Sequence, residues 1–350
     1  MHQFPDHPDA ITPEWWGEVL GRVPTRWQWE PIGTGQVGDS VRFTLEFGSG
    51  EPPLTLAGKF AAADPTSRST AAMLGLYARE VQFYRDLALH LGVRTPRIHA
   101  AEIAPDGASF ILLFEDLGPA RGGNQIAGCT IEDARAAICQ AAALHGPSWH
   151  NPAMLDLDWL QPSEAAAAQV KALYPQAQAV FRERYADVLE PEYMALCEEL
   201  AEITAATTAR NEKTSLVHGD FRLDNLLFDI TGGAEPIAVL DWQTVGVGNG
   251  LRDVGYFLGC GIGDGLRRAH ERELLELYCA EMTARGVPLT VEAIWRDYVL
   301  GAVHGISTAV FSAAFVVRTQ RGDANFLSMA RGACALCLEH GSLKLMKEDA

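Results

Sequence analysis

Two acidic residues and an amide follow two short apolar segments, each predicted to be a strand. Asp220 and Asn225 are five residues apart in the segment LVHGDFRLDNLLF, residues 216–228, where an apolar strand leads into a polar loop. A second strand, PIAVL, residues 236–240, ends directly at Asp241. Asp220 suits a base that accepts the proton of an attacking hydroxyl group, while Asn225 and Asp241 carry the hard oxygen ligands that Mg²⁺ prefers. This combination of residue types predicts phosphoryl transfer.

Other side chains in the same loop have several interpretations. Arg222 is a candidate for stabilising charge on the transferring phosphoryl group. His218 is interpreted as a structural residue that is hydrogen-bonded within the loop, with a general base as the alternative. Asp224 and Asp229 are expected on the surface.

A glycine-rich segment near the N-terminus offers a place for phosphates. Gly33, Gly35 and Gly38 have the spacing GxGxxG, which two phosphate-binding architectures share. The dinucleotide-binding architecture requires a helix after the turn. Residues 41–47, VRFTLEF, alternate apolar and polar side chains instead. The pattern favours a strand–turn–strand flap over ATP phosphates, and a plain hairpin turn is the alternative.

Two charges occupy positions where apolar residues are expected. Lys59 interrupts the apolar strand 54–61, and Glu80 lies in a helical stripe with Met73, Tyr77, Tyr84 and Leu87. A buried charge is costly unless it is paired. We therefore expect an ion pair that presents the lysine to nucleotide phosphates. The alternative is a solvated Glu80 at the edge of the stripe and a lysine that extends to solvent.

The pattern HGDxxxxN at 218–225, followed by Asp241, resembles the aminoglycoside phosphotransferase and choline kinase group of the protein-kinase-like superfamily. The segments HGDFRLDNLLF and VLDWQTVG are similar to the corresponding segments of ecdysteroid-kinase-like proteins and of bacterial phosphotransferases associated with acyl-CoA dehydrogenases. The resemblance extends from about residue 28 to about residue 340. It implies an α+β, two-lobed protein-kinase-like fold, with an antiparallel sheet and one long helix in residues 1–117 and a mainly helical lobe in residues 118–350.

The resemblance also implies cofactors and roles. ATP and Mg²⁺ would be the cofactors, with Asp220 as the base and Asn225 and Asp241 as metal ligands. The nucleotide-binding residues implied or predicted are Gly33, Gly35, Gly38, Lys59, Glu80, and Glu115 and Leu117 of the hinge segment FEDL, residues 114–117.

Two departures from the family pattern bear on the acceptor. The motif that contains Asp241 reads Asp-Trp-Gln at 241–243 rather than the Asp-Phe-Gly of protein kinases, which points to small-molecule acceptors. Shortly after it, Asn249-Gly250 stands where many relatives have an Asp-Pro pair. Aminoglycosides, amino alcohols, sugars, sterol-like alcohols and hydroxyacyl-CoA thioesters all remain open as acceptors. Candidate acceptor contacts, each with a structural alternative, are His145, Trp149, Arg252, Asp253, Tyr256, Trp295 and His304.

Composition limits the class of protein. The chain has 350 residues, 48% of them hydrophobic, and a formal net charge of −17, which argues against nucleic-acid binding and against docking on an anionic membrane. Seven scattered cysteines and the lack of a signal peptide favour a reducing, cytoplasmic setting. Cys334 and Cys337 are interpreted as buried apolar residues rather than a redox or zinc motif. The uncharged stretch Val299–Val317 is interpreted as a core helix rather than a membrane span.

Two other function classes stay open at this point. One is a catalytically silent pseudokinase that binds a nucleotide without turnover. The other is a dinucleotide oxidoreductase, which would rest on the glycine spacing alone. Oligomeric state has no signature in the sequence.

Overall fold

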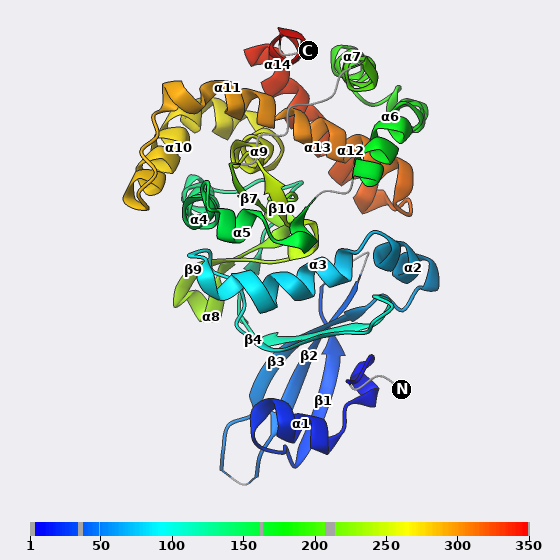
Figure 1. Cartoon of the computed structure of the whole chain (residues 1–350), viewed down its shortest axis with the longest axis vertical. Coiled ribbons are helices and arrows are strands. Elements are labelled where there is room, and N and C mark those ends of the chain that lie inside the picture. Colours follow the sequence, from blue (N-terminus) through cyan, green and yellow to red (C-terminus); the bar gives the residue numbers. More distant parts are fainter. Residues whose placement is uncertain (1–3, 34–37, 49, 162–163, 207–213, 349–350) are drawn as a thin grey trace. The chain divides into compact units, whose positions relative to one another are not determined.

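The computed structural model describes residues 4–33, 38–48, 50–161, 164–206 and 214–348 (Figure 1). The chain divides into two compact units. The first unit comprises Met1–His90, Arg94–Ala120 and Asp229–Val245. The second unit comprises Leu91–Val93, Arg121–Phe228 and Gly246–Ala350.

An antiparallel sheet of five strands forms the centre of the first unit, in the order β1-β2-β3-β5-β4. Its strands are β1 (Arg26–Pro31), β2 (Gly38–Glu46), β3 (Leu54–Ala61), β4 (Ile98–Ile103) and β5 (Phe110–Glu115). The alternation predicted for 41–47 is confirmed, because Val41, Phe43 and Leu45 are buried on one face. That face packs against α1 (Pro13–Leu20), where the Trp16 ring lies 5.4 Å from the Phe43 ring.

The helical region after β3 is segmented rather than continuous. It consists of α2 (Pro65–Met73), α3 (Leu76–Gln82), the π-helical segment η2 (Phe83–Leu87) and the 3₁₀ segment η3 (Ala88–His90). The break falls at Gly75, whose positive φ of 68° suits glycine. Four members of the predicted stripe are buried, but Met73 is 78% exposed, because it lies on α2 before the break. The prediction of one long helix is wrong at this point.

The remaining segments of the first unit are η1 (Pro8–Ala10), α8 (Ile230–Gly233), β9 (Glu235–Val239) and η6 (Trp242–Thr244). Of these, η6 packs against α3 although the two lie far apart in the sequence. The ring of Trp242 stacks on Phe83, with 3.9 Å between centroids and 7° between planes. This stacking fixes the segment that contains Asp241 against the end of α3.

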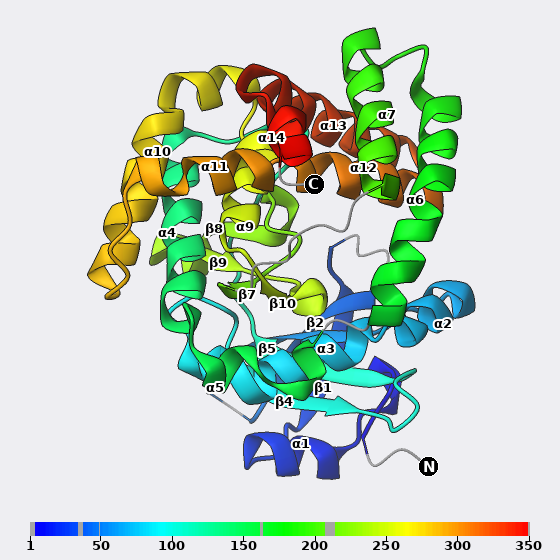
Figure 2. The same cartoon turned by 45° about the horizontal axis from the view of Figure 1, so that its top comes forward.

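Helices dominate the second unit (Figure 2). Helices α4, α11 and α12 all pack against α9, which follows the predicted catalytic loop, residues 218–225, in the chain. The helices are α4 (Ile131–Ser148), α5 (Pro152–Leu155), η4 (Asp158–Leu160), α6 (Glu164–Tyr185), α7 (Pro191–Ala206), η5 (Leu223–Asn225), α9 (Leu251–Tyr256), the π-helical η7 (Phe257–Gly261), α10 (Asp264–Ala284), α11 (Val291–Gly301), α12 (Val303–Phe315), α13 (Gln320–His340) and α14 (Ser342–Glu348). The strands are β6 (Arg121–Gly122), β7 (Ser215–Val217), β8 (Leu226–Asp229) and β10 (Gly246–Gly248).

Glycines allow the helices around α9 and η7 to approach each other closely. A Cβ added at Gly301 of α11 would overlap the carbonyl oxygen of Leu251. One added at Gly332 of α13 would overlap the carbonyl oxygen of Gly259. The backbone around α9 and η7 is therefore held in place by contacts that tolerate no side chain at these two positions.

One stretch is apolar enough to cross a membrane by length and composition. It runs from Val291 to Phe315 with a mean hydropathy of 1.5, and 56% of that window is buried inside the structure. The stretch is divided between α11 and α12, which both pack against α9. This burial supports the interpretation of 299–317 as part of the core, but the stretch forms two helices rather than one, and Phe315 and Val317 at its end are exposed.

The cysteines include two buried residues on α13. All seven are free, and Cys334 and Cys337 are almost fully buried, as predicted for small apolar side chains. The Sγ of Cys334 lies 3.7 Å from the Sγ of Cys197 on α7. These side chains contribute to the core between α7 and α13.

Candidate active site

Lys59 of β3 and Glu80 of α3 form the expected ion pair. The Lys59 Nζ lies 2.9 Å and 2.7 Å from the two carboxylate oxygens of Glu80, and the glutamate side chain is 2% exposed. Lys59 also lies 3.0 Å from Oδ1 of Asp241, a contact that sequence reasoning missed. One ammonium group therefore holds two carboxylates within the first unit.

Burial and charge oppose each other at this cluster. Burial lowers the pKa of Lys59, but the charges of Asp241 and Glu80 raise it by a larger amount, so the net shift of this pKa is upward. Burial raises the pKa of Glu80 above its ordinary value, although Lys59 opposes the shift. The lysine is consequently a permanent cation in a partly buried position, as phosphate binding requires.

The backbone at Asp241 adopts a strained conformation. Its φ of 63° and ψ of 71° lie in the left-handed region, which costs a residue other than glycine about 1–3 kcal/mol. The strain is maintained by the preceding strand β9 and by the stacked ring of Trp242. The carboxylate keeps 32% of its surface exposed, and strain of this kind is common where a side chain must face a ligand.

The glycine-rich segment joins β1 to β2, which confirms the predicted strand–turn–strand unit. Gly33 has a φ of 75°, and a Cβ at Gly38 would come within 3.0 Å of the carbonyl oxygen of Phe60. Gly35 lies outside the described residues. A dinucleotide-binding fold requires a helix at this place, so the glycine spacing gives no support to an oxidoreductase.

The predicted hinge is held by arginines. Glu115 accepts hydrogen bonds from Nη1 of Arg94 at 2.6 Å and from the backbone N–H of Arg97 at 2.8 Å. Burial raises the pKa of Glu115, but these donors lower it by more. The carbonyl of Leu117 accepts the N–H of Thr231 at 2.8 Å. The Glu115 carboxylate is thus engaged, and the adenine-binding role of the hinge backbone stays a prediction.

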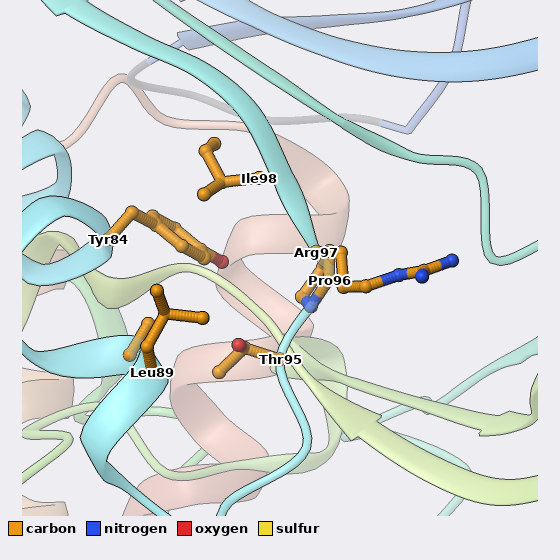
Figure 3. Close-up of a pocket in the computed structure, with 7 residues that line it drawn as sticks. Tyr84, Leu89, Thr95, Pro96, Arg97 and Ile98 are labelled. Carbon is orange, nitrogen blue, oxygen red and sulfur yellow. The ribbon is translucent and has the colours of Figure 1, made fainter.

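The first unit has an apolar pocket (Figure 3). It opens between the end of η2 and the start of β4. None of the residues predicted to bind the nucleotide is among those that line it, which are Tyr84, Ala88, Leu89, Thr95, Pro96, Arg97 and Ile98.

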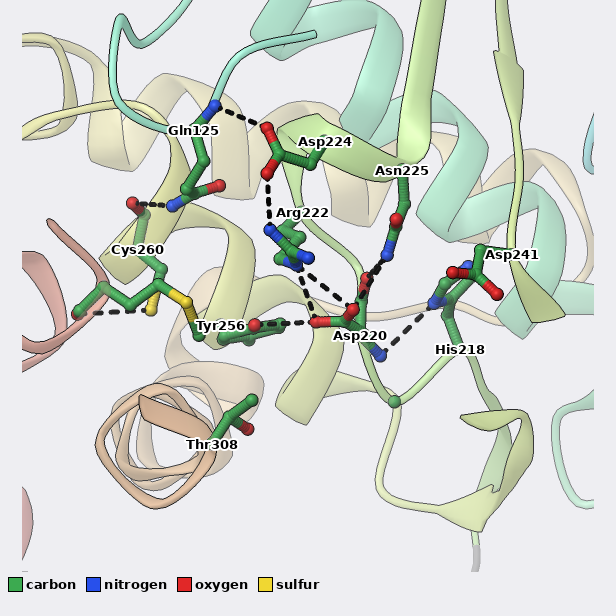
Figure 4. Close-up of polar contacts among 12 residues, drawn as sticks. Gln125, His218, Asp220, Arg222, Asp224, Asn225, Asp241, Tyr256, Cys260 and Thr308 are labelled. Carbon is green, nitrogen blue, oxygen red and sulfur yellow. Dashed lines mark hydrogen bonds and ion pairs between the residues drawn. The ribbon is translucent and has the colours of Figure 1, made fainter. Parts of the chain in front are cut away.

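Three donors converge on the carboxylate of Asp220 in the second unit (Figure 4). The Tyr256 hydroxyl donates to Oδ1 at 2.8 Å, and the Asn225 amide donates to Oδ2 at 2.9 Å. The Nε of Arg222 lies 3.0 Å and 3.1 Å from the two oxygens. The chain therefore fixes both the position and the rotation of this carboxylate.

These contacts keep Asp220 ionised. Burial raises the pKa of its carboxyl group, but the charge of Arg222 and the hydrogen bond from Tyr256 outweigh burial and make the net shift downward. An ionised carboxylate accepts hydrogen bonds only, which suits a group that receives the proton of a hydroxyl.

Asn225 and Asp241 have the donor chemistry for Mg²⁺. The amide nitrogen of Asn225 donates to the carbonyl oxygen of Asp220 at 2.8 Å and to its carboxylate, so the amide oxygen is the group left for a cation. Asp241 adds a partly exposed carboxylate. Hard oxygen ligands of this kind fit Mg²⁺.

Arg222 is shared between two carboxylates rather than directed at solvent. Its Nη1 lies 2.8 Å from Asp224, whose side chain is 11% exposed and also accepts the N–H of Gln125 at 3.0 Å. The expectation that Asp224 is a surface residue is wrong, because the carboxylate ties the catalytic loop to residue 125. Asp229 is exposed, as expected. The role of Arg222 toward a phosphoryl group stays a prediction.

Asp253 braces the catalytic loop from α9. It accepts the backbone N–H of His218 at 2.6 Å and that of Gly219 at 3.0 Å. His145 contacts it at 3.3 Å and contacts the hydroxyl of Tyr278 at 2.9 Å. His145 and Asp253 have no exposed side-chain surface, so they serve as internal supports rather than acceptor contacts.

His218 also has the structural role expected of it. Its Nδ1 accepts the backbone N–H of Asp220 at 3.2 Å, and the residue is fully buried. A buried imidazole engaged in this way is poorly placed to act as the general base.

Three other residues predicted to contact the acceptor lie beside the catalytic loop. The imidazole of His304 donates to the carbonyl of Gly219 at 2.7 Å and stacks edge-on with Tyr256. Burial, assisted by the charge of Arg252, lowers the pKa of His304 to about 4, so its ring is neutral at pH 7. His304 and Tyr256 thus belong to the catalytic loop environment, where Arg252 also lies.

The two tryptophans on the candidate list have other neighbours. Trp149 lies at the end of α4 beside the ring of His150. Trp295 on α11 packs against Tyr298 and His340. Among the described residues, neither indole ring has a ring contact or hydrogen bond with the catalytic loop. Their acceptor roles stay predictions.

Comparison with known proteins links these residues to one family. The sequence model described as the phosphotransferase enzyme family matches residues 62–286. Acyl-CoA dehydrogenase family member 10 of Mus musculus is 53% identical over 47 residues, which is 13% of this chain and 4% of that protein. The chain therefore matches only a small part of that relative.

Solved structures share the fold. A Ralstonia eutropha JMP134 protein assigned as an aminoglycoside phosphotransferase has a TM-score of 0.59 at 17% identity, over 93% of this chain and 97% of that one. Choline kinase from Cryptosporidium parvum Iowa II has a TM-score of 0.51 at 12% identity, over 92% and 91%. The GDP and kanamycin complex of APH(2'')-IIIa has a TM-score of 0.50 at 15% identity, over 95% and 96%. These similarities show the α+β, two-lobed protein-kinase-like fold.

Proposed function

Because this chain belongs to the phosphotransferase enzyme family, in its aminoglycoside phosphotransferase and choline kinase-like group, we propose that it moves the γ-phosphoryl group of ATP to a hydroxyl of a small molecule in a Mg²⁺-dependent reaction. The observation that carries the proposal is the ionised Asp220 carboxylate, held by Tyr256, Asn225 and Arg222. We also propose a cytoplasmic location, which the seven free cysteines favour.

The residues of the first unit would bind the nucleotide. Lys59 presents a cation that Glu80 orients, and phosphate oxygens are its natural partners. Gly33 and Gly38, at the ends of the β1–β2 connection, would let the backbone approach the same phosphates closely. ATP is proposed here as the phosphoryl donor. GTP is the alternative, because one structural neighbour was solved as a GDP complex.

Asp220 would act on the acceptor. The acceptor hydroxyl donates to the carboxylate, its oxygen attacks the γ-phosphorus, and the bond from that phosphorus to the β–γ bridging oxygen breaks. The proton passes to Asp220, and ADP leaves with the electrons of the broken bond. When bound, Mg²⁺ held by Asn225 and Asp241 would neutralise phosphate charge.

Replacing the base tests this proposal. We expect Asp220→Asn to lower acceptor-dependent ADP release by at least about 100-fold, because an amide cannot take the proton. Mg-ATP affinity should stay within about three-fold of wild type, since Asp220 is not among the proposed nucleotide ligands. Asp229→Asn removes an exposed carboxylate close in sequence and serves as the matched control.

The same experiment separates an enzyme from a pseudokinase. Turnover that survives in Asp220→Asn would contradict the assigned base. A wild-type protein that binds Mg-ATP, yet transfers phosphate to none of a broad set of hydroxylated metabolites, would instead support the silent nucleotide-binding module.

A further inference from the structure

The start of α9 carries a guanidinium group for which the described residues provide no ion pair. Arg252 is the second residue of this helix, and its Nε is buried without a hydrogen-bond partner. Burial lowers the pKa of Arg252, and the charge of Asp253 opposes this effect only in part. A cation in such a position is destabilising unless something else compensates it.

The carboxylate beside Arg252 is already fully engaged. Asp253 receives the backbone N–H groups of His218 and Gly219 at 2.6 Å and 3.0 Å, and the ring of His145 at 3.3 Å. The Asp253 carboxylate therefore binds the backbone of the catalytic loop and has no direct contact with Arg252. Arg252 is therefore adjacent to an acid in sequence but is not neutralised by a direct contact with it.

Another buried arginine in the second unit shows what a purely structural guanidinium looks like here. Arg267 on α10 has no exposed side-chain surface, and its two terminal nitrogens pair with Glu271 at 3.0 Å and Glu339 at 2.7 Å. Its Nε lacks a hydrogen-bond partner, as that of Arg252 does, so the difference between the two arginines lies in these ion pairs. The fold thus supplies carboxylates where an arginine is needed for stability. No such carboxylate contacts Arg252 in the described part of the chain.

Arg252 also lies beside the loop that carries the base. A Cβ at Gly248 would lie 3.7 Å from the Arg252 Cζ, and Gly248 belongs to β10, which pairs with β7 directly before His218. The charge of Arg252 lowers the pKa of His304, whose ring binds the carbonyl of Gly219. His304 is neutral at pH 7, so Arg252 is the charged group of this pair.

We propose that Arg252 binds an anionic group of the acceptor, so that the acceptor is a hydroxy compound that carries a carboxylate or a phosphate. The proposal rests on the proposed function and names the class of its acceptor. A guanidinium group binds either anion through two parallel hydrogen bonds. A cationic acceptor would instead place like charges together, which counts against amino alcohols and aminoglycosides despite the net charge of −17.

Acceptors that differ only in charge test the proposal. Glycerate, glycerol 3-phosphate, glycerol and 3-amino-1,2-propanediol share one three-carbon frame and carry a carboxylate, a phosphate, no charge and a cation respectively. Acceptor-dependent ADP release with Mg-ATP gives kcat/KM for each compound. The proteins compared are wild type, Arg252→Gln, Arg252→Lys and, as a matched control, Arg272→Gln, which removes an exposed cation of α10.

We expect the anionic compounds to have the highest kcat/KM in the wild type. Arg252→Gln should lower their kcat/KM by about 10–100-fold, the usual range for a lost charge-assisted hydrogen bond, and change glycerol by less than about two-fold. Arg252→Lys should retain part of the preference, and Arg272→Gln all of it. A wild type that prefers glycerol or the amino diol, or an Arg252→Gln variant that loses activity equally on all four compounds, would overturn the proposal.

Thermal stability separates a binding residue from a structural one. Removing an uncompensated buried charge should leave the thermal midpoint of ligand-free Arg252→Gln unchanged or higher than that of the wild type. A clear fall in the midpoint would show that Arg252 supports the fold and would count against the proposal.

Failure of the parent function is recognised separately. If Mg-ATP raises the thermal midpoint but none of the four compounds accepts phosphate, phosphoryl transfer to this class fails. Anion binding at Arg252 is then tested with inorganic phosphate, which should raise the thermal midpoint of the wild type more than that of Arg252→Gln. Equal shifts in the two proteins would sink the inference.

Discussion

At the scale of single residues, Lys59 is engaged by two carboxylates at once, at 2.7 Å from Glu80 and 3.0 Å from Asp241. Lys59→Met leaves both acids without their cation, whereas Glu80→Gln keeps the contact between Lys59 and Asp241. We expect Lys59→Met to lose about 3 kcal/mol of unfolding free energy and Glu80→Gln to lose clearly less. Urea unfolding midpoints measure the difference.

Nucleotide binding gives the second measurement for the same pair of variants. Lys59→Met should weaken Mg-ATP binding by at least about ten-fold, because a charge-assisted contact to phosphate is lost. Equal Mg-ATP affinity in wild type and Lys59→Met would contradict the proposed role of the lysine.

The sequence predicted the contacts of some site residues but not of others. Lys59 and Glu80 were detectable because each charge interrupts an apolar pattern. Asp224 was misassigned, because its partner at residue 125 is remote in sequence and only folding brings the two together. The contact of Lys59 with Asp241 joins residues 182 apart in the sequence, so no local pattern reveals it. The two acids that engage Arg222 lie only two residues to either side of it, but their spacing alone does not show that both contact the guanidinium group.

At the scale of helices and strands, close backbone contacts around η7 make a sharp prediction. Gly332→Ala on α13 places a methyl group onto the carbonyl oxygen of Gly259, and backbone atoms cannot move aside as a flexible side chain can. We expect a loss of about 1–3 kcal/mol or more in unfolding free energy. Gly265→Ala on α10, where a Cβ meets nothing within 4 Å, should instead be neutral or stabilising by about 0.5–1 kcal/mol. A similar effect of the two changes on the urea midpoint would show that α13 does not pack as described.

A carboxylate of α10 predicts how stability depends on pH. Burial raises the pKa of Glu271, but hydrogen bonds from His340 of α13 and Tyr298 of α11, together with Arg267, lower it to about 2. Because the folded pKa lies below the ordinary value of 4.5, the stability from this group is present above about pH 4.5 and is lost as the pH falls toward 2.

Exchange of this glutamate isolates its contribution. We expect Glu271→Gln to be less stable than wild type by about 1–3 kcal/mol at pH 7, and this deficit to fall to about half or less at pH 3. Glu276→Gln, which removes an exposed partner of Arg272, should change stability by less than about 0.5 kcal/mol at either pH. Urea unfolding at the two pH values is the measurement. A difference between wild type and Glu271→Gln that does not shrink at pH 3 would contradict the assignment.

The elements themselves were only partly predictable. Alternation in 41–47 identified β2 correctly, because its two faces have different environments. The helix after β3 was predicted as continuous, because a stripe of spacing 3 and 4 does not reveal a break at Gly75. Burial of the apolar stretch around α12 followed from its small residues, since Gly305 lies where a Cβ would meet the Sγ of Cys260.

At the scale of the whole molecule, the resemblance to the family predicted the fold class, and the matched family model supports it over residues 62–286. Local pattern could not show that Asp229–Val245 returns to the first unit, while the residues on either side belong to the second. That assignment depends on contacts such as the stacking of Trp242 on Phe83, which lie far apart in the sequence. Composition restricted the partners, but charge at a single site, as at Arg252, can differ from the net charge of the chain.

The proposed metal ligands give the last prediction, which tests whether both act through one ion. We propose Asn225 and Asp241 as ligands of the Mg²⁺ that accompanies ATP. Chelation of Mg²⁺ should abolish ADP release in the wild type. Asn225→Ala and Asp241→Asn should each lower kcat by at least about 100-fold, a loss of several kcal/mol in charge stabilisation. Because both changes would remove the same ion, the double variant should be little worse than either single one. Losses that multiply in the double variant, or turnover that persists without a divalent ion, would show that the two side chains do not act through one metal.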